Sequence, residues 1–443
     1  MRWRCRPECL KVKAFSSEVD TGSREENASK QETRASVPIQ SERKTALIPL
    51  TTGDNPRGAL FRALVPNQHS RVTAAELFFD LVFVFAVTQV SHTLLNHFTP
   101  LGAIQTTLLF LAVWWVWVFT AWITNWLDPE QTPVRLLLFC LMFAGLVLST
   151  SIPHAFESRG LWFASAYVAM QVGRTGFWLV SVPPARVAVR WNAIRILSWL
   201  CVSAIFWILG GLANGETRLW LWIVALAIEY VAPIARFWIP RYGASTIEDW
   251  YVEGGHMAER CAGFILIALG EAIVVNGATF GELTWTPETV GAFISAFVAS
   301  IAMWWIYFHK GAEAGSELIS KSAESGRLAR SAYTYLHMPI VAGIILSAVA
   351  DEVVLKHPGG HSDLKTVLSA IGGPLLFLVG TILFKHNIRG FLQLSHGVGI
   401  IALAALAFVA RELSPLMLSA LTTAIMIMVA VWESLSLRSV KAE

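Results

Sequence analysis

Charged residues are scarce in this chain, and their scarcity excludes an ordinary soluble protein. Only 15% of the 443 residues are Asp, Glu, Lys or Arg, whereas 55% are hydrophobic. A soluble domain carries roughly 25% charged residues. The formal net charge of +3 is small, and its excess lies before residue 72, so nothing favours nucleic-acid binding. The lipid bilayer is therefore the expected partner.

Cysteines and catalytic motifs are also few. Cys5 and Cys9 lie near the start, and Cys140, Cys201 and Cys261 lie in apolar stretches, where a thiol behaves as a small hydrophobe. We therefore expect no disulfide framework, no metal site and no cofactor. The sequence contains no G-x-S-x-G, Walker or H-E-x-x-H motif, which argues against the commonest hydrolases and nucleotide-driven pumps.

The first seventy residues differ in composition from the rest. The basic first residues are not followed by the apolar run of a signal peptide, so no cleaved signal is expected. Residues 16–60 are rich in Ser, Thr, Glu, Arg, Gln and Asn and have few aromatic residues. Such a segment buries too little apolar area to offset its chain entropy. We predict a disordered cytoplasmic tail over residues 1–70.

After residue 70 the chain becomes a series of apolar stretches. Each is close to the ~20 residues that a helix needs to cross a membrane, and the runs lack the alternation of barrel strands. We predict an all-α polytopic membrane helix bundle of about twelve transmembrane helices. The expected segments are 74–95, 101–126, 134–152, 160–182, 193–212, 218–238, 256–278, 287–308, 328–350, 366–385, 391–410 and 413–434.

The distribution of Lys and Arg between alternate loops predicts the orientation. If the N-terminus is inside, the cytoplasmic loops and the C-terminal end hold fourteen Lys and Arg residues, against five on the opposite side. Positive residues accumulate on the cytoplasmic side. Both termini are therefore expected in the cytoplasm.

Three short motifs recur in the same order in the first and last six segments. Ala75-Glu76 matches Ala258-Glu259, LAVWWVW matches IAMWWIY, and AGLVLS matches AGIILS. We interpret them as a duplication into two six-helix halves, residues 71–240 and 241–443. Six helices per half would make the halves parallel, and transporters built from repeats bind near the membrane midplane between them.

Ionisable residues inside apolar segments are the candidate functional residues, because each costs at least ~2.5 kcal/mol in the bilayer. Glu76 stands in the capping-box pattern Thr73-Ala-Ala-Glu76, so it could either cap the helix or take part in function. Asp80 lies one turn deeper on the same face. Arg174 should return to a similar depth from the fourth segment, where it could neutralise Asp80.

Two further candidates have plausible structural roles. Glu229 lies in the middle of its segment beside Pro233, which could open the backbone near a cavity, although a bond to a neighbouring helix would explain Glu229 equally well. His337 could carry protons near neutral pH, but a lone membrane histidine is more often hydrogen-bonded in packing.

The seventh segment carries the largest group of candidates. Glu259 and Arg260 lie near its inner end, and Glu271 follows eleven residues after Arg260, on the same helical face. Glu271 has no nearby cation in its own segment, which suits either a proton-coupling residue or a neutral structural one. Gly263 and Gly270 near this face would allow another helix to approach closely.

An interfacial motif with E-x-x-H spacing precedes that segment. It comprises Asp249, Glu253, His256 and Glu259. In helix bundles this spacing can project metal ligands inward. Gly254-Gly255 would interrupt a helix within it, and a second copy is missing, so we favour a solvated loop over a metal site.

These residues carry a resemblance to a known family. ELFFDLVFVFAVTQVSH from Glu76, DWYVEGGHMAERCAGFILIALGEAI from Asp249 and RLARSAYTYLHMPIVAGIIL from Arg327 resemble the bacterial low temperature requirement A (LtrA) membrane proteins. The resemblance implies a multi-helix protein of the bacterial cytoplasmic membrane, in a family named for growth in the cold, and implies no particular reaction. The family's signature residues present here are Glu76, Asp80, Glu253, His256, Glu259, Arg260 and Glu271.

We consider three classes of function. The tandem halves and their membrane carboxylates favour a secondary transporter or channel for an ion or small solute. The alternatives are a membrane enzyme acting on a lipid or isoprenoid through the interfacial motif, and a sensor or assembly protein whose buried charges serve packing. Whether the chain is an enzyme stays open, with catalysis the less favoured interpretation.

Overall fold

The computed structural model describes residues 60–62, 71–246, 253–309, 329–390 and 392–439. Helices make up nearly all of these residues, and within them the only extended pairings are two isolated antiparallel bridges. The prediction of an all-α membrane helix bundle is confirmed. The predicted tail falls largely outside the described residues.

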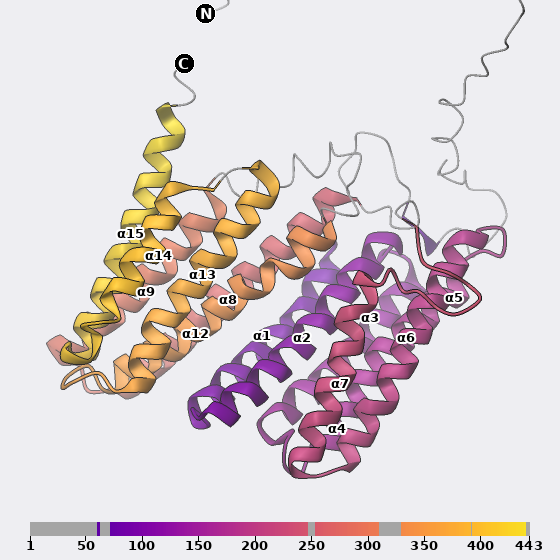
Figure 1. Ribbon diagram of the computed structural model, residues 1–443, viewed down its shortest axis with the longest axis horizontal. Coiled ribbons are helices and arrows are strands. Elements are labelled where there is room, and N and C mark those ends of the chain that lie inside the picture. The colour runs from indigo at the N-terminus through magenta and orange to yellow at the C-terminus, as the bar shows by residue number, and fades with distance from the viewer. Residues whose placement is uncertain (1–59, 63–70, 247–252, 310–328, 391, 440–443) are drawn as a thin grey trace, which may run out of the picture. The chain divides into compact units, whose positions relative to one another are not determined.

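Figure 1 shows the helices of the described residues. In chain order they are α1 (Ala74–Asn96), α2 (Pro100–Trp126), α3 (Thr132–Ser151), the short η3 (Ile152–His154), α4 (Gly160–Val168), the π turn η4 (Ala169–Gly173), α5 (Arg174–Ser181), α6 (Val187–Leu212), α7 (Gly215–Ile234), α8 (Gly254–Glu282), α9 (Pro287–Phe308), the π turn η6 (Ala329–Tyr335), α12 (His337–Lys356), α13 (Leu364–Arg389), α14 (Leu394–Leu406), the short η7 (Ala410–Glu412) and α15 (Pro415–Ser439).

Within the described residues every predicted segment corresponds to helix, but three are not single α-helices, and one of these, the segment 328–350, contains the π turn η6 before α12. Among the described residues, ten helices are long and apolar enough to cross a membrane. The predicted segment 160–182 is divided by the π turn into α4, η4 and α5, and the segment 391–410 contains α14, which has 13 residues. The number of membrane crossings therefore stays a prediction.

Threonine and proline define where several helices begin. The Thr99 side chain caps α2 and the Thr286 side chain caps α9, and in each case proline follows at the first helical position. A threonine oxygen satisfies a backbone N–H that has no partner within the helix, and proline has no N–H to satisfy there. These local signals set where α2 and α9 begin.

Helix α2 lies at the centre of the hydrophobic core. Trp114, Trp115 and Trp117 are each at most 1% exposed, and α2 contacts α1, α5, α7, α8 and α12. The matching tryptophans of α9, Trp304 and Trp305, are 42% and 41% exposed. The repeated tryptophan pair therefore occupies different environments, buried in α2 and outward-facing in α9.

Helices α12 and α13 pack backbone to backbone. A Cβ atom at Gly343 would lie 2.5 Å from the backbone nitrogen of Phe377, and one at Gly373 would lie 2.6 Å from that of Ser347. Close approach was expected instead at Gly263, where a Cβ atom would meet nothing within 4 Å. Gly270 gives the same result, so that expectation is wrong: no helix of the described residues is pressed against the face of α8 that carries these glycines.

We expect Gly343→Ala to lower the unfolding free energy by about 1 to 3 kcal/mol, because the added methyl group forces two packed backbones apart. Thermal unfolding of the purified protein in detergent would measure the change. Gly263→Ala is the matched control and should be neutral or slightly stabilising, since alanine favours the helix. Equal stability of the two variants would contradict the packing argument.

Candidate functional site

Helix α1 begins with a carboxylate that caps the helix and also enters a buried ionic network. The Glu76 side chain accepts from the backbone N–H of Thr73 at 2.9 Å, and the Thr73 hydroxyl accepts from that of Glu76, which completes a capping box. Glu76 is fully buried, and its oxygens also lie 2.9 Å from Arg62 Nη2 and from His256 Nε2. Capping and membership of the network therefore coexist.

Asp80, one turn deeper in α1, is paired with Arg260 of α8. Arg260 Nη2 donates to Asp80 Oδ1 at 2.7 Å, and Trp117 Nε1 donates to the same oxygen at 2.8 Å. Arg260 Nη1 lies 3.3 Å from an oxygen of Glu76. One buried guanidinium thus bridges both carboxylates of α1.

Arg174 does not neutralise Asp80, and that expectation is wrong. The Arg174 guanidinium donates to the Val116 carbonyl at 3.1 Å and to Thr120 Oγ1 at 3.0 Å. Helix α2 lies between the two residues. Its Trp117 side chain donates to Asp80, whereas its Val116 carbonyl and Thr120 hydroxyl accept from Arg174. The sequence argument compared only how deep Asp80 and Arg174 lie in the membrane, and equal depth does not show whether another helix lies between them.

The solvated-loop interpretation of His256 is also wrong. Helix α8 begins at Gly254, so the glycine pair opens the helix instead of interrupting it. Glu253 caps this start by accepting from the backbone N–H groups of Gly255 at 3.1 Å and His256 at 2.7 Å. His256 is fully buried, and its Nδ1 lies 3.2 Å from Asn125 Nδ2.

The remaining members of the interfacial motif have other positions. Glu259 is exposed and accepts from the backbone N–H of Val72 at 3.1 Å. Asp249 lies outside the described residues. Within the described part of the chain, no three His, Cys, Asp or Glu side chains are grouped to hold a metal ion.

Arg62 is a member of the network that the sequence did not indicate. It falls inside the predicted disordered tail, yet its backbone N–H donates to the Trp126 carbonyl at 2.9 Å, and Phe61 pairs with Leu127. Arg62 Nε donates to the Thr124 carbonyl at 2.7 Å. Residues 60–62 are therefore held against the end of α2, in contrast to the predicted disorder.

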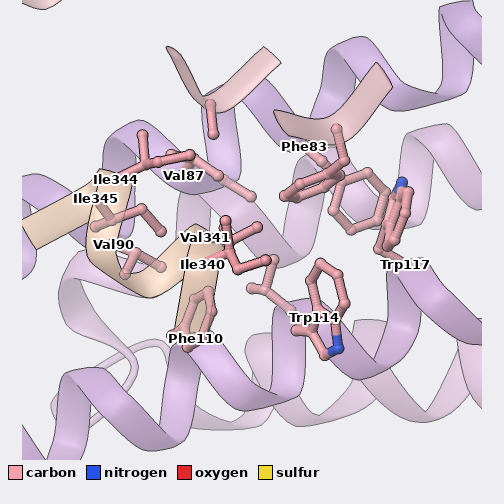
Figure 2. Packing of buried hydrophobic residues seen from close by; sticks show 14 of the residues in the cluster. Phe83, Val87, Val90, Phe110, Trp114, Trp117, Ile340, Val341, Ile344 and Ile345 are labelled. Atoms are coloured by element: carbon pink, nitrogen blue, oxygen red, sulfur yellow. The ribbon is translucent and has the colours of Figure 1, made fainter. Parts of the chain in front are cut away.

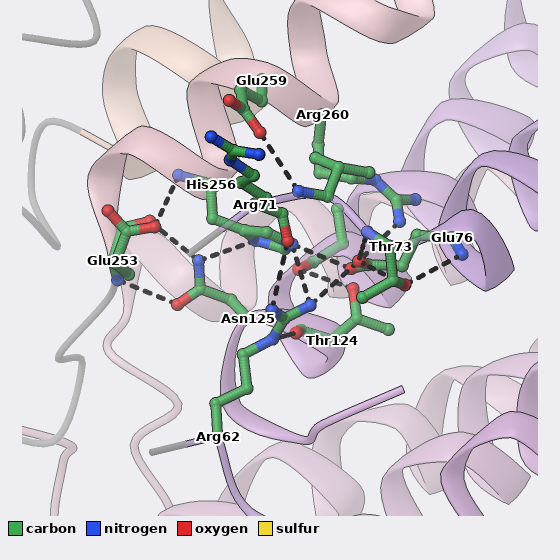
Figure 3. Close-up of polar contacts among 12 residues, drawn as sticks. Arg62, Arg71, Thr73, Glu76, Thr124, Asn125, Glu253, His256, Glu259 and Arg260 are labelled. Atoms are coloured by element: carbon green, nitrogen blue, oxygen red, sulfur yellow. Dashed lines mark hydrogen bonds and ion pairs between the residues drawn. The ribbon is translucent and has the colours of Figure 1, made fainter. Parts of the chain in front are cut away.

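We call Arg62, Glu76, Asp80, His256 and Arg260 the inner ionic cluster. Figure 3 shows Arg62 and His256 side by side at Glu76, with Arg62 Nη2 3.2 Å from His256 Nε2 and Arg260 close by. Two arginines balance two carboxylates when the imidazole is neutral. Burying charges costs several kcal/mol per ion, and only such mutual pairing offsets this cost.

A second set of polar contacts lies farther along the same helices. Thr88 Oγ1 of α1 donates to Glu271 of α8. Glu271 follows Arg260 by eleven residues, or ~16 Å of helical rise. Beyond it, Asn276 Nδ2 donates to Asp351 Oδ2 of α12 at 3.0 Å. We call Thr88, Glu271, Asn276 and Asp351 the outer polar set.

An apolar layer separates the two polar groups. Between Asp80 and Thr88, helix α1 contributes the buried side chains of Phe83 and Val87. Figure 2 shows these two side chains packed with aliphatic and aromatic side chains of α2 and α12, namely Phe110, Trp114, Ile340, Val341 and Ile344. The interface of α1 therefore alternates from ionic to apolar to polar along its length.

Glu229 and His337 lie outside both groups and have complete sets of partners. Glu229 accepts from Tyr167 at 2.6 Å, from Ser203 at 2.6 Å and from Trp207 at 2.9 Å. His337 is fully buried, with Tyr307 at 2.8 Å from Nε2 and the Ala332 carbonyl at 2.8 Å from Nδ1. These contacts agree with the structural interpretation of both residues.

A further buried ion pair was not recognised in the sequence. Lys385 Nζ lies 2.8 Å from both oxygens of Glu433 and donates to the Ile306 carbonyl at 2.8 Å. Lys385 is one of the fourteen Lys and Arg residues that the orientation argument assigns to the cytoplasmic side, because it stands at the end of the predicted segment 366–385. The structure places its side chain inside the bundle, 2% exposed.

Comparisons with known proteins agree on one family. A family model described as bacterial low temperature requirement A protein (LtrA) matches residues 71–431. An uncharacterized protein of Rhizobium meliloti (strain 1021) is 41% identical over 376 residues, which cover 85% of this chain and 92% of that protein. No solved structure matches the chain. The matched range contains the whole inner ionic cluster except Arg62.

We expect Arg260→Met to lower the unfolding free energy by about 3 kcal/mol or more, because it leaves Glu76 and Asp80 without their shared cation. Adding Asp80→Asn should restore part of the loss by removing one uncompensated charge. Thermal unfolding in detergent would follow all variants. Arg135→Met, which removes an exposed arginine 3.5 Å from Glu130, should change stability by no more than ~0.5 kcal/mol. A loss from Arg260→Met no larger than this control would contradict the buried pairing.

Proposed function

Because the chain belongs to the bacterial low temperature requirement A family and is an integral membrane protein, we propose that it is a secondary transporter or channel for an ion or small solute. The observation that carries the proposal is the sequence of polar groups along the interface of α1 and α8. The inner ionic cluster and the outer polar set lie at two depths, with the apolar layer between them.

Two polar stations separated by an apolar barrier are what a gated pathway requires. An ion needs polar groups to replace its water, and a closed barrier must exclude water. Asp80 supports this role, because its Oδ2 is buried and has no hydrogen-bond partner among the described residues. A group that served packing alone would be expected to have both oxygens satisfied.

The register of α1 and α8 supports the proposed duplication into residues 71–240 and 241–443. Matching Glu76 to Glu259 relates positions 183 residues apart, and the bonded pair of Thr88 and Glu271 is separated by the same 183 residues. Equivalent positions meet where two parallel halves are related by an axis between them. Helix α1 contacts α2 and α3, and α8 likewise contacts α9 and α12.

We further propose that the protein lies in the bacterial cytoplasmic membrane with both termini in the cytoplasm. This orientation rests on the excess of Lys and Arg in alternate loops. It places the inner ionic cluster near the cytoplasmic surface and the outer polar set nearer the other surface.

Cysteine labelling tests the orientation. In a variant whose five cysteines are replaced by serine, we expect Ser158→Cys to react with a membrane-impermeant maleimide in intact cells. Glu130→Cys, on the predicted cytoplasmic side, should react only after lysis. The opposite pattern would reverse the proposed orientation and exchange the two ends of the pathway.

Ion flux in proteoliposomes tests transport. Under an imposed pH or salt gradient, we expect Asp80→Asn and Glu271→Gln each to reduce proton or cation flux by about tenfold or more, since each removes the carboxyl group of one station. Glu282→Gln, at the exposed end of α8, is the matched control and should keep the flux of the unsubstituted protein. Thermal unfolding would verify that the variants are folded.

The other classes of function predict different results. An interfacial enzyme should lose lipid turnover in His256→Ala while showing no flux in any form. A sensor or assembly protein should show no flux under any gradient, and the two carboxylate variants should affect only stability. Absence of flux from folded, unsubstituted protein would reject the proposed transport.

A further inference from the structure

A small polar cavity lies among α9, α12, α13 and α15. About 20 Å³ of it is open to a water-sized sphere, which is room for roughly one or two water molecules or a bare ion and too little for an organic solute. Its polar lining residues are all buried, between 4% and 9% exposed: Ser347, Asp351, Ser419, Thr422 and Thr423. Asp351 is the one residue that this cavity shares with the outer polar set.

Asp351 is a buried carboxylate without a cation from the protein. It is the one ionisable residue that lines the cavity, and its Oδ2 accepts from Asn276 Nδ2 at 3.0 Å. No Lys, Arg or His of the described residues forms an ion pair with it. By contrast, Asp80 pairs with Arg260 at 2.7 Å, and Glu433 pairs with Lys385 at 2.8 Å. A carboxylate in hydrocarbon needs a counter-charge, so the occupant of this cavity should carry positive charge.

The hydroxyl of Ser347 lies beside this carboxylate and is unsatisfied. Ser347 precedes Asp351 by four residues, which places both on one face of α12. Its Oγ is buried and has no hydrogen-bond partner among the described residues. A buried hydroxyl is normally paired, because leaving it unpaired costs free energy. The lone pairs of this oxygen are therefore available to an occupant.

Helices α13 and α15 add further oxygen atoms. Pro374 lies inside α13 and has no N–H, so the carbonyl of Ala370 lacks the donor that a regular helix would provide. Both residues line the cavity. On α15, the Thr422 hydroxyl donates its hydrogen to the Ser419 carbonyl at 2.9 Å, which leaves the lone pairs of its oxygen free to accept. Carbonyls released by interrupted membrane helices are known ligands of Na⁺ in transporters.

We propose that this cavity binds one dehydrated Na⁺ ion. The carboxylate of Asp351, the hydroxyls of Ser347 and Thr422 and the carbonyl of Ala370 are its ligands, and the ion neutralises Asp351. A single carboxylate balances a monovalent ion, whereas Ca²⁺ sites usually combine several carboxylates. A role for this ion in driving or entering the pathway rests on the proposed transport, but its binding does not.

Equilibrium binding of radioactive Na⁺ to the purified full-length chain in detergent tests the proposal. We expect saturable binding of one Na⁺ per chain, and competition by K⁺ that is weaker by about tenfold or more, because the larger ion needs a wider cage of oxygens. Asp351→Asn should lower the affinity for Na⁺ by about tenfold or more, since it removes the charged ligand and can keep the bond from Asn276. Ser347→Ala should weaken binding severalfold.

Matched variants separate lost ligands from misfolding. Glu412→Gln removes an exposed carboxylate in η7 and should keep the affinity for Na⁺. Pro374→Ala supplies the N–H that satisfies the Ala370 carbonyl, so it should weaken Na⁺ binding in a protein whose thermal unfolding is cooperative and not lowered. Replacing choline chloride by sodium chloride should raise the melting temperature of the unsubstituted chain and not that of Asp351→Asn, because a ligand of the folded state stabilises it.

The outcomes for this site and for transport are distinct. Absence of saturable Na⁺ binding, equal competition by K⁺, or unchanged affinity in Asp351→Asn would each overturn the Na⁺ site. Binding is measured without a membrane gradient, so ion flux without Na⁺ binding rejects this site and leaves transport standing. Na⁺ binding without flux supports the site and rejects transport.

Discussion

The ionic contact of Arg260 with Glu76 and Asp80 is the constraint on which the packing of α8 against α1 depends. These three side chains are at most 1% exposed, so none can be hydrated where it lies. The cost of burying these charges is offset only if α8 stays beside α1 in the observed register. A slip of one residue would turn the guanidinium away from both carboxylates. The capping residues Thr73 and Glu253 fix the starts of the same two helices and so fix that register from both sides.

A pathway along this interface would have to open and close the same contact. In the proposed pathway, Arg260 and its two carboxylates would close the inner end, and Arg62, 2.9 Å from Glu76, would have to separate from it as well. An entering cation could replace Arg260 at Asp80 without leaving the carboxylate uncompensated, so exchange need not incur the full cost of a bare buried charge. Phe83 and Val87 would still have to move, because the apolar layer contains no group that can coordinate an ion.

Much of this arrangement could be predicted from the sequence, although the partners could not. Uninterrupted apolar length identified the helices, and charge within apolar segments identified Glu76, Asp80 and Arg260 as candidates. Helical periodicity gives depth and face but not neighbours, so Asp80 was assigned to Arg174 although α2 separates them. His256 was predicted to lie in a solvated loop because glycine pairs often interrupt helices. Here Gly254 and Gly255 form the first turn of α8, and the Glu253 side chain caps that turn. Arg62 gave no signal, since its contacts come from a bridge to the end of α2 and not from any local pattern.

Helix α2 couples the two proposed halves more closely than a boundary at residue 240 suggests. Its Trp114 and Trp122 indoles donate to the carbonyl and the hydroxyl of Thr334, in the π turn before α12, at 2.8 Å and 3.1 Å. Trp117 from the same helix holds Asp80, and α2 also contacts α8. A rigid rotation of one half against the other would break these buried bonds together. A motion that keeps the bonds of Trp114 and Trp122 to Thr334 must move α2 and the π turn as one unit. The interface could then open only where the ends of α1 and α8 are paired.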